Sequence, residues 1–207
     1  EKEISSEVTT WSEPVLAWKK DVTPDQDNAT NVENSAIALW KNELYFGLSH
    51  RKGVSIVDRR NGETLGHLET KASVQSRPTV TETMVLAVDI SGTIYAWGLV
   101  SKTELWKVEL NAPVNTEMTF FQGQFFVATN SDVVYSLSTE GEILWRYAHR
   151  ADPSRQTKLQ LLGAAKPLAR ENDVVLGFSD GAVVRVDRET SDIIEQVWNG
   201  AGRYPDI

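Results

Sequence analysis

The chain has 207 residues, of which 41% are hydrophobic, and its 29 Asp and Glu against 21 Lys and Arg give a formal charge of −8. This composition can build a buried core, but an acidic chain in which no basic run exceeds two residues is a poor match for nucleic acid, so no nucleic-acid partner is expected. Cysteine is absent, which excludes disulfides, thiolate nucleophiles and Cys-based metal sites, and no apolar stretch approaches the ~20 residues that a membrane-spanning helix needs.

The N-terminal part of the chain is predicted to lie outside the repeated units. Residues 1–13 are polar and are expected to be a flexible lead-in. The apolar-then-basic segment near 15–20, which contains Trp18, is predicted to be an orphan outer strand because its form resembles the ends of the later repeats. Residues 23–34 are rich in turn formers and are predicted to be a surface loop.

A strand-turn-strand unit then recurs four times. Its copies begin at Lys52, Gly92, Asp132 and Gly181, which are 40, 40 and 49 residues apart. Such periods are typical of β-propeller blades, because one four-stranded sheet cannot bury both faces until its neighbours stack against it. The sequence therefore predicts an all-β fold, a β-propeller of about four four-stranded antiparallel blades. The propeller is assigned to 14–207, with repeats at about 35–72, 73–114, 115–152 and 157–202 and an incomplete blade start at 203–207.

The two ends of this pattern bear on how a ring would close. An outer strand without its own blade at the front and an unfinished blade at the back indicate part of a larger ring, or a ring completed by a second chain in a homodimer. Four blades could also close alone, since propellers have about four to eight.

Two recurrent residue types are predicted to set the packing between blades. Small residues in the second strands are expected to let adjacent sheets approach closely; they are Gly47, Ala87, Ala128 and Gly177. Tryptophans at outer-strand positions are predicted to be wedges between blades rather than a platform for a ligand. These are Trp18, Trp106, Trp145 and Trp198.

One insertion departs from the repeat, between the third and fourth copies. Residues 150–158 are polar and are followed by three leucines in four positions, Leu159, Leu161 and Leu162. Such a run is either an inner strand of the fourth blade or an exposed apolar anchor for a partner. The residues alone favour the inner strand, because apolar runs in propellers are usually core.

No constellation of catalytic residues stands out. The histidines, His50, His67 and His149, share no motif and are predicted to be solvated turn residues. A Gly-x-Ser-x-Gly elbow, a glycine-rich phosphate loop and a metal-ligand cluster are missing from the sequence. The chain is therefore predicted not to be an enzyme and to hold no cofactor or metal.

The repeat resembles the tryptophan-docking repeat of the quinoprotein-like (PQQ-like) propellers. Within that group the chain is most similar to the BamB family, propeller lipoproteins of the bacterial outer-membrane β-barrel assembly machinery. The matching segments are Ser76–Pro78, Leu159–Gly163 with Ala165–Pro167, and Arg203–Ile207. In the family, a Leu-x-Leu-Arg-Gly stretch corresponds to Leu159–Gly163, and an Arg-Leu-x-Asp-Val stretch corresponds to Arg203–Ile207. The resemblance implies that the chain is about half of an eight-bladed ring.

The resemblance also implies a function. In that family the leucine loop and the acidic residue downstream dock onto the periplasmic domains of the central barrel subunit, which implicates Leu159, Leu161 and Asp206 here. Leu162 stands where the family has arginine, and Arg203 begins the second stretch. A non-catalytic scaffold in the periplasm, at the periplasmic face of the outer membrane, is expected. It would be held there by a lipid anchor not present in this chain and would contact unfolded outer-membrane proteins as further partners.

Two alternatives remain open. A fragment of a quinone-dependent dehydrogenase would have the same repeat, although that family's adjacent-cysteine element is impossible in this chain. A generic propeller interaction module of another envelope complex would differ from the scaffold only in the segments around Leu159–Leu162 and Arg203–Asp206, because fold alone does not define function.

Overall fold

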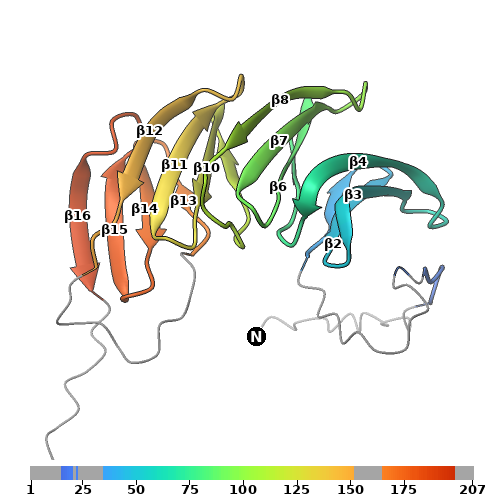
Figure 1. Cartoon of the computed structure of the whole chain (residues 1–207), viewed down its shortest axis with the longest axis horizontal. Helices are drawn as coiled ribbons and strands as arrows, with labels where there is room; N and C mark the ends of the chain where they lie inside the picture. Colours follow the sequence, from blue (N-terminus) through green and yellow to red (C-terminus); the bar gives the residue numbers. More distant parts are fainter. Residues whose placement is uncertain (1–14, 21, 23–34, 152–164, 199–207) are drawn as a thin grey trace, which may run out of the picture.

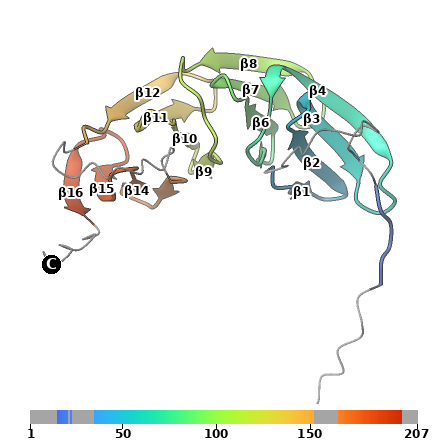
Figure 2. The same cartoon turned by 60° about the horizontal axis from the view of Figure 1, so that its bottom comes forward.

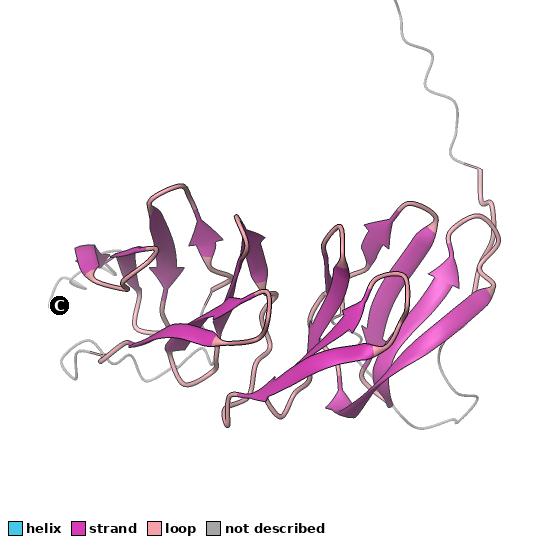
Figure 3. Ribbon diagram, turned by 90° about the horizontal axis from the view of Figure 1, so that it is seen from above, coloured by secondary structure: helices cyan, strands magenta, loops and turns pink. Residues whose placement is uncertain are grey.

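The computed structural model describes residues 15–20, 22, 35–151 and 165–198, and these form four antiparallel four-stranded sheets. In each sheet the strands follow one another in chain order, so every connection is a hairpin between neighbours. Figure 3 shows the described part of the chain as strands and loops. We call the sheets blades 1 to 4.

The sixteen strands have the following bounds. Blade 1 contains β1 (Ala38–Trp40), β2 (Glu43–Leu48), β3 (Arg51–Asp58) and β4 (Thr64–Ser73). Blade 2 contains β5 (Thr79–Val80), β6 (Met84–Val88), β7 (Thr93–Gly98) and β8 (Glu104–Glu109). Blade 3 contains β9 (Thr119–Phe121), β10 (Gln124–Ala128), β11 (Val133–Ser138) and β12 (Ile143–Ala148). Blade 4 contains β13 (Leu168–Ala169), β14 (Asp173–Gly177), β15 (Ala182–Asp187) and β16 (Ile193–Trp198).

The blades follow one another in an arc (Figures 1 and 2). Figure 2 shows β4, β8 and β12 on its convex side and β1 and β9 on its concave side. The first strand of each blade is thus the inner strand and the fourth the outer strand, as in a propeller. The prediction of an all-β propeller of four-stranded antiparallel blades is confirmed, whereas closure into an eight-bladed ring stays a prediction.

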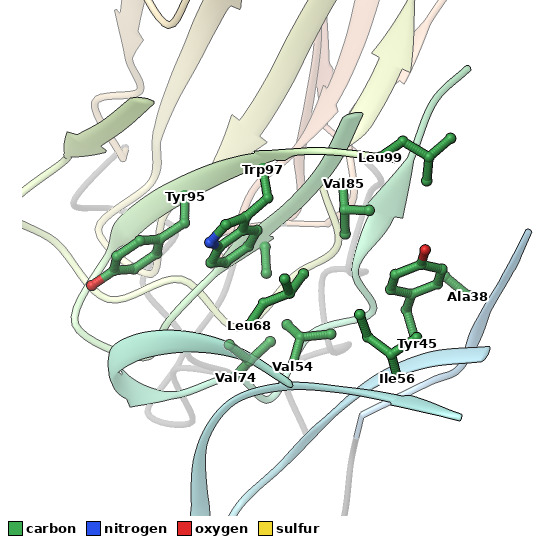
Figure 4. Close-up of a cluster of buried hydrophobic side chains, with 11 residues drawn as sticks. Ala38, Tyr45, Val54, Ile56, Leu68, Val74, Val85, Tyr95, Trp97 and Leu99 are labelled. Atoms are coloured by element: carbon green, nitrogen blue, oxygen red, sulfur yellow. The ribbon is translucent and has the colours of Figure 1, made fainter. Parts of the chain in front are cut away.

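The core lies between blades rather than inside any one of them. Alternate residues of the middle strands face opposite neighbours, since successive side chains of a strand point to opposite faces. In β7, Tyr95 and Trp97 face blade 1, whereas Ile94 and Ala96 face blade 3. Figure 4 shows the cluster between blades 1 and 2, where Trp97 lies near Leu68. This double-sided burial explains why β6 and β7 are buried along their whole length.

The small residues of the second strands have a different role from the predicted one at two positions. A Cβ added at Gly47 would overlap the backbone of Val74, in the connection from β4 to β5. A Cβ at Gly177 would lie 3.2 Å from the Cβ of Ala165, in the chain that approaches β13. At these two positions the small residue therefore makes room for the chain entering an inner strand.

Three tryptophans form the predicted wedges. Trp18 Nε1 donates to the carbonyl oxygen of Arg59 at 2.7 Å, and Trp106 and Trp145 make the same bond to Thr139 and Arg188 at 2.8 and 2.7 Å. Each acceptor lies in the turn between the third and fourth strands of the next blade along the chain. The bond fixes one blade against the hairpin of its neighbour.

The prediction for Trp198 is wrong. Strand register places Gly66, Trp106, Trp145 and Glu195 at equivalent positions of the four outer strands, opposite Ile56, Ala96, Ser136 and Arg185. Trp198 lies three residues beyond this position and is 38% exposed. Between blades 1 and 2, where the equivalent residue is Gly66, the buried indole comes instead from Trp97, which stacks on Tyr95 at 5.6 Å.

Residues 15–20 do not form the predicted orphan strand. A strand needs a hydrogen-bonded neighbour, and the structure assigns none to this segment. Trp18 nevertheless docks on blade 1 as an outer-strand tryptophan would, and with Val22 it covers Phe46, Leu48 and Val57. The predicted lead-in 1–13, loop 23–34 and blade start 203–207 lie outside the described residues.

Candidate partner-binding edge between blades 3 and 4

The five residues predicted to bind a partner lie outside the described residues. They are Leu159, Leu161, Leu162, Arg203 and Asp206. The structure does describe the residues that flank their segments. The first segment lies between residue 151, three residues beyond β12, and Ala165, and the second begins after Trp198, at the end of β16.

These flanking residues meet at one turn, formed by Phe178–Gly181 between β14 and β15. On one side, His149 Nε2 lies 2.9 Å from Asp180 Oδ2, and its ring stacks on Phe178 with centroids 4.2 Å apart. On the other side, Trp198 pairs with Ala182, whose backbone N–H donates to Asp180 Oδ1 at 2.9 Å. Asp180 thus links the end of blade 3 to the start of β15, which pairs with the end of β16.

The returning end of the first segment reaches the same turn. The backbone N–H of Ala165 donates to the carbonyl oxygen of Gly177 at 3.0 Å. Figure 1 shows β12 and β16 running toward the same edge of the arc. We call this region, built from the ends of β12 and β16 and the β14–β15 turn, the blade 3–4 edge.

Blade 3 supports the edge through Asp132, in the β10–β11 turn. The backbone carbonyl of Asp132 accepts from His149 N–H at 3.0 Å, and its carboxylate accepts from the Ser179 hydroxyl at 2.6 Å. Asp132 has a φ of 55°, a left-handed conformation that Asp tolerates better than most residues. The turns of the two blades are therefore bonded to each other, and the edge has a rigid base.

His149 is not the solvated turn residue that the sequence predicts. The side chains of His149 and Asp180 are 2% and 3% exposed. Burial, and then the negative charge of Asp180, raise the pKa of Tyr147, which packs on Phe178. No local signal identifies this pair, because its partners are 31 residues apart and come together only when two blades pack.

His67 also departs from the prediction, because it is half-buried within strand β4, where it pairs with Ser55 of β3. Burial, and then the neighbouring positive charge of Arg51, lower its pKa. His67 therefore stays neutral over a wider pH range than a solvated histidine would.

One exposed apolar side chain of blade 4 lies beside this edge. Val197 of β16, which pairs with Val183 next to the turn, is about half-exposed, whereas the half-exposed Ile193 and Ile194 lie at the other end of the strand. Exposed apolar side chains are a common component of protein-binding surfaces. The described residues contain no group of three or more His, Asp and Glu placed to hold a metal ion. Within those residues we also find no helix able to traverse a lipid bilayer.

Comparisons with known proteins agree with this architecture. A family profile described as outer membrane protein assembly factor BamB matches residues 50–201. The curated BamB of Shewanella oneidensis is 24% identical in an alignment 143 residues long. This alignment covers 63% of this chain and 36% of that protein.

Solved structures show the same fold. The crystal structure of BamB from Moraxella catarrhalis matches with a TM-score of 0.65 at 20% identity, over 83% of this chain and 52% of that one. The computationally designed Ika4 protein matches with a TM-score of 0.62 at 15% identity, over 78% of this chain and 94% of that one. The chain thus spans about half of the solved BamB and about a third of the curated one.

Proposed function

Since the chain belongs to the family of outer membrane protein assembly factors named BamB, we propose that it is a non-catalytic scaffold of outer-membrane protein assembly. It binds the periplasmic domains of the central barrel subunit and aids the insertion of β-barrel proteins. This function places it in the periplasm, at the inner face of the outer membrane, where a lipid anchor holds it.

The observation that supports this proposal most is the blade 3–4 edge. The leucine segment and the Arg203–Asp206 segment are 41 residues apart in sequence, counted from Leu162 to Arg203, yet the described residues that flank them meet at one turn. We propose that one partner covers this turn and contacts both segments. Val197 of β16 adds a half-exposed apolar side chain beside the same turn. We propose Leu159, Leu161 and Leu162 as its apolar contacts and Arg203 and Asp206 as its charged contacts.

A paired substitution tests this assignment. Leu159→Asp with Leu161→Asp is expected to weaken binding to the periplasmic domains at least about a hundredfold, because charges replace apolar side chains at the centre of the interface. The thermal midpoint is expected to stay nearly unchanged. Isothermal titration calorimetry measures the first quantity and scanning calorimetry the second.

A matched control places the same chemical change elsewhere. Leu65 in β4 and Leu105 in β8 are both half-exposed, on the outer strands of blades 1 and 2. Leu65→Asp with Leu105→Asp is expected to retain binding. If the Leu159 and Leu161 variant instead loses much of its stability, these leucines are core and the assignment fails.

A further inference from the structure

A groove follows the concave side of the arc and extends to Lys166, next to Ala165 of the chain that enters β13. Two pockets of about 310 and 510 Å³ lie there, and Arg77, Glu117 and Lys166 line both of them. Because the pockets share these residues, they form one continuous depression, which we call the inner groove. The inner strands β1, β5 and β9 border it, each at the edge of its own sheet.

The charges of the inner groove come from one position of the repeat. Arg77, Glu117 and Lys166 each stand two residues before the first residue of an inner strand. Lys166 Nζ pairs with Glu117 Oε2 at 2.7 Å, so these two charges compensate each other. Arg77 is exposed, and its guanidinium makes no hydrogen bond or ion pair with any described residue. The groove therefore keeps one uncompensated positive charge in a protein whose formal charge is −8.

A second group beside Arg77 also lacks a partner. Ser76 lines the larger pocket and is 4% exposed. Its hydroxyl is buried without a hydrogen-bond partner among the described residues. Buried hydroxyl groups in native structures are nearly always hydrogen-bonded, so one left open beside an open guanidinium indicates a place for an acceptor. A carboxylate supplies acceptors for both groups, and Arg binds carboxylates in a bidentate geometry.

The rest of the groove suits an extended chain. Leu39, Val80 and Phe120, at equivalent positions of β1, β5 and β9, line the smaller pocket beside Arg77. Leu39 and Phe120 are substantially exposed. A strand at a sheet edge leaves half of its backbone N–H and C=O groups unpaired, which favours addition of an extended peptide. Apolar contacts, backbone pairing and one cation are therefore available side by side.

We propose that the inner groove binds an extended peptide that carries a carboxylate next to an aromatic or large aliphatic side chain. The carboxylate pairs with Arg77 and accepts from Ser76, and the apolar side chain lies against Leu39 and Phe120. The choice of a peptide as ligand rests on the proposed function, in which unfolded outer-membrane proteins are partners. The carboxylate is either that of an Asp or Glu side chain or that of a chain terminus.

Three labelled eight-residue peptides test the proposal by fluorescence anisotropy with the purified chain alone. All alternate Val and Thr and contain one Phe. The first has Asp beside Phe and an amidated end, the second ends in Phe with a free carboxylate, and the third is amidated with Asn in place of Asp. We expect one or both charged peptides to bind at least about tenfold more tightly than the neutral one, since a hydrogen-bonded charge pair contributes this much. The stronger of the two identifies the source of the carboxylate.

Variants of two exposed arginines give the control. Arg77→Glu is expected to remove the preference for the charged peptides, whereas Arg51→Glu, the same change in β3 outside the groove, retains it. Equal binding of all three peptides, absence of binding, or equal loss in both variants would overturn the proposal. The barrel subunit is absent from this assay. A negative result for peptide binding is therefore distinguishable from a failure of the propeller to dock through the blade 3–4 edge.

Discussion

Trp145→Ala is expected to lower the free energy of unfolding by about 3–5 kcal/mol, the usual cost of removing a buried tryptophan. Trp145 is 7% exposed and packs on Phe126, with ring centroids 5.8 Å apart. Its Nε1 also donates to the carbonyl oxygen of Arg188 in blade 4. The variant therefore leaves a cavity between blades 3 and 4 and removes one of the hydrogen bonds that join them. Urea denaturation followed by far-ultraviolet circular dichroism measures the change.

Trp198→Ala is the matched control. It removes the same side chain from another outer strand. Trp198 is 38% exposed and does not occupy the strand position that Trp106 and Trp145 share. We expect a loss of about 1 kcal/mol or less, as for most partly exposed positions. Equal losses in the two variants would contradict the view that the tryptophans that donate to the turn of the next blade contribute more to stability than Trp198.

Gly92→Ala is expected to lower the free energy of unfolding by about 3 kcal/mol or more. The variant is therefore expected to be partly unfolded at moderate temperature. Gly92 has a φ of 87°, where a side chain costs roughly 1–2 kcal/mol. An added Cβ would also overlap the carbonyl oxygen of Ala112, in the connection from blade 2 to blade 3. Backbone must move to relieve that overlap, which adds to the conformational cost.

Gly123→Ala separates these two contributions. Gly123 has a similar φ of 79°, but a Cβ there would meet nothing within 4 Å. Gly123→Ala is expected to lower the free energy of unfolding by only the penalty for a side chain at positive φ, about 1–2 kcal/mol. If the thermal midpoints of both variants fell equally, the close approach at Gly92 would have no energetic role.

The arrangement of the blades could be predicted because it is repeated along the sequence. A turn such as Arg59–Gly62, where Gly62 has a φ of 74°, marks its own hairpin through residue type. Alternating apolar residues then fix the strands around it. Trp106 and Trp145 could be identified as wedges because both occupy one position of the repeat. Each of these features depends on residues close together in sequence.

Features that depend on contacts between blades could not be predicted. His149 and Asp180 stand in no motif, and neither residue alone indicates a buried pair. Ser76 and Arg77 resemble an ordinary polar turn until the fold places them in a groove with Phe120. Trp198 was misassigned because residue type was compared without strand register, which places Glu195 at the position of Trp106 and Trp145.

We propose that this propeller docks on the barrel-assembly subunit through the blade 3–4 edge. The first measurement to make is multi-angle light scattering of the purified chain, alone and mixed with the periplasmic domains of that subunit. We predict a one-to-one complex that the Leu159→Asp and Leu161→Asp variant does not form. A well-folded chain that keeps its own mass in the mixture would contradict the claim.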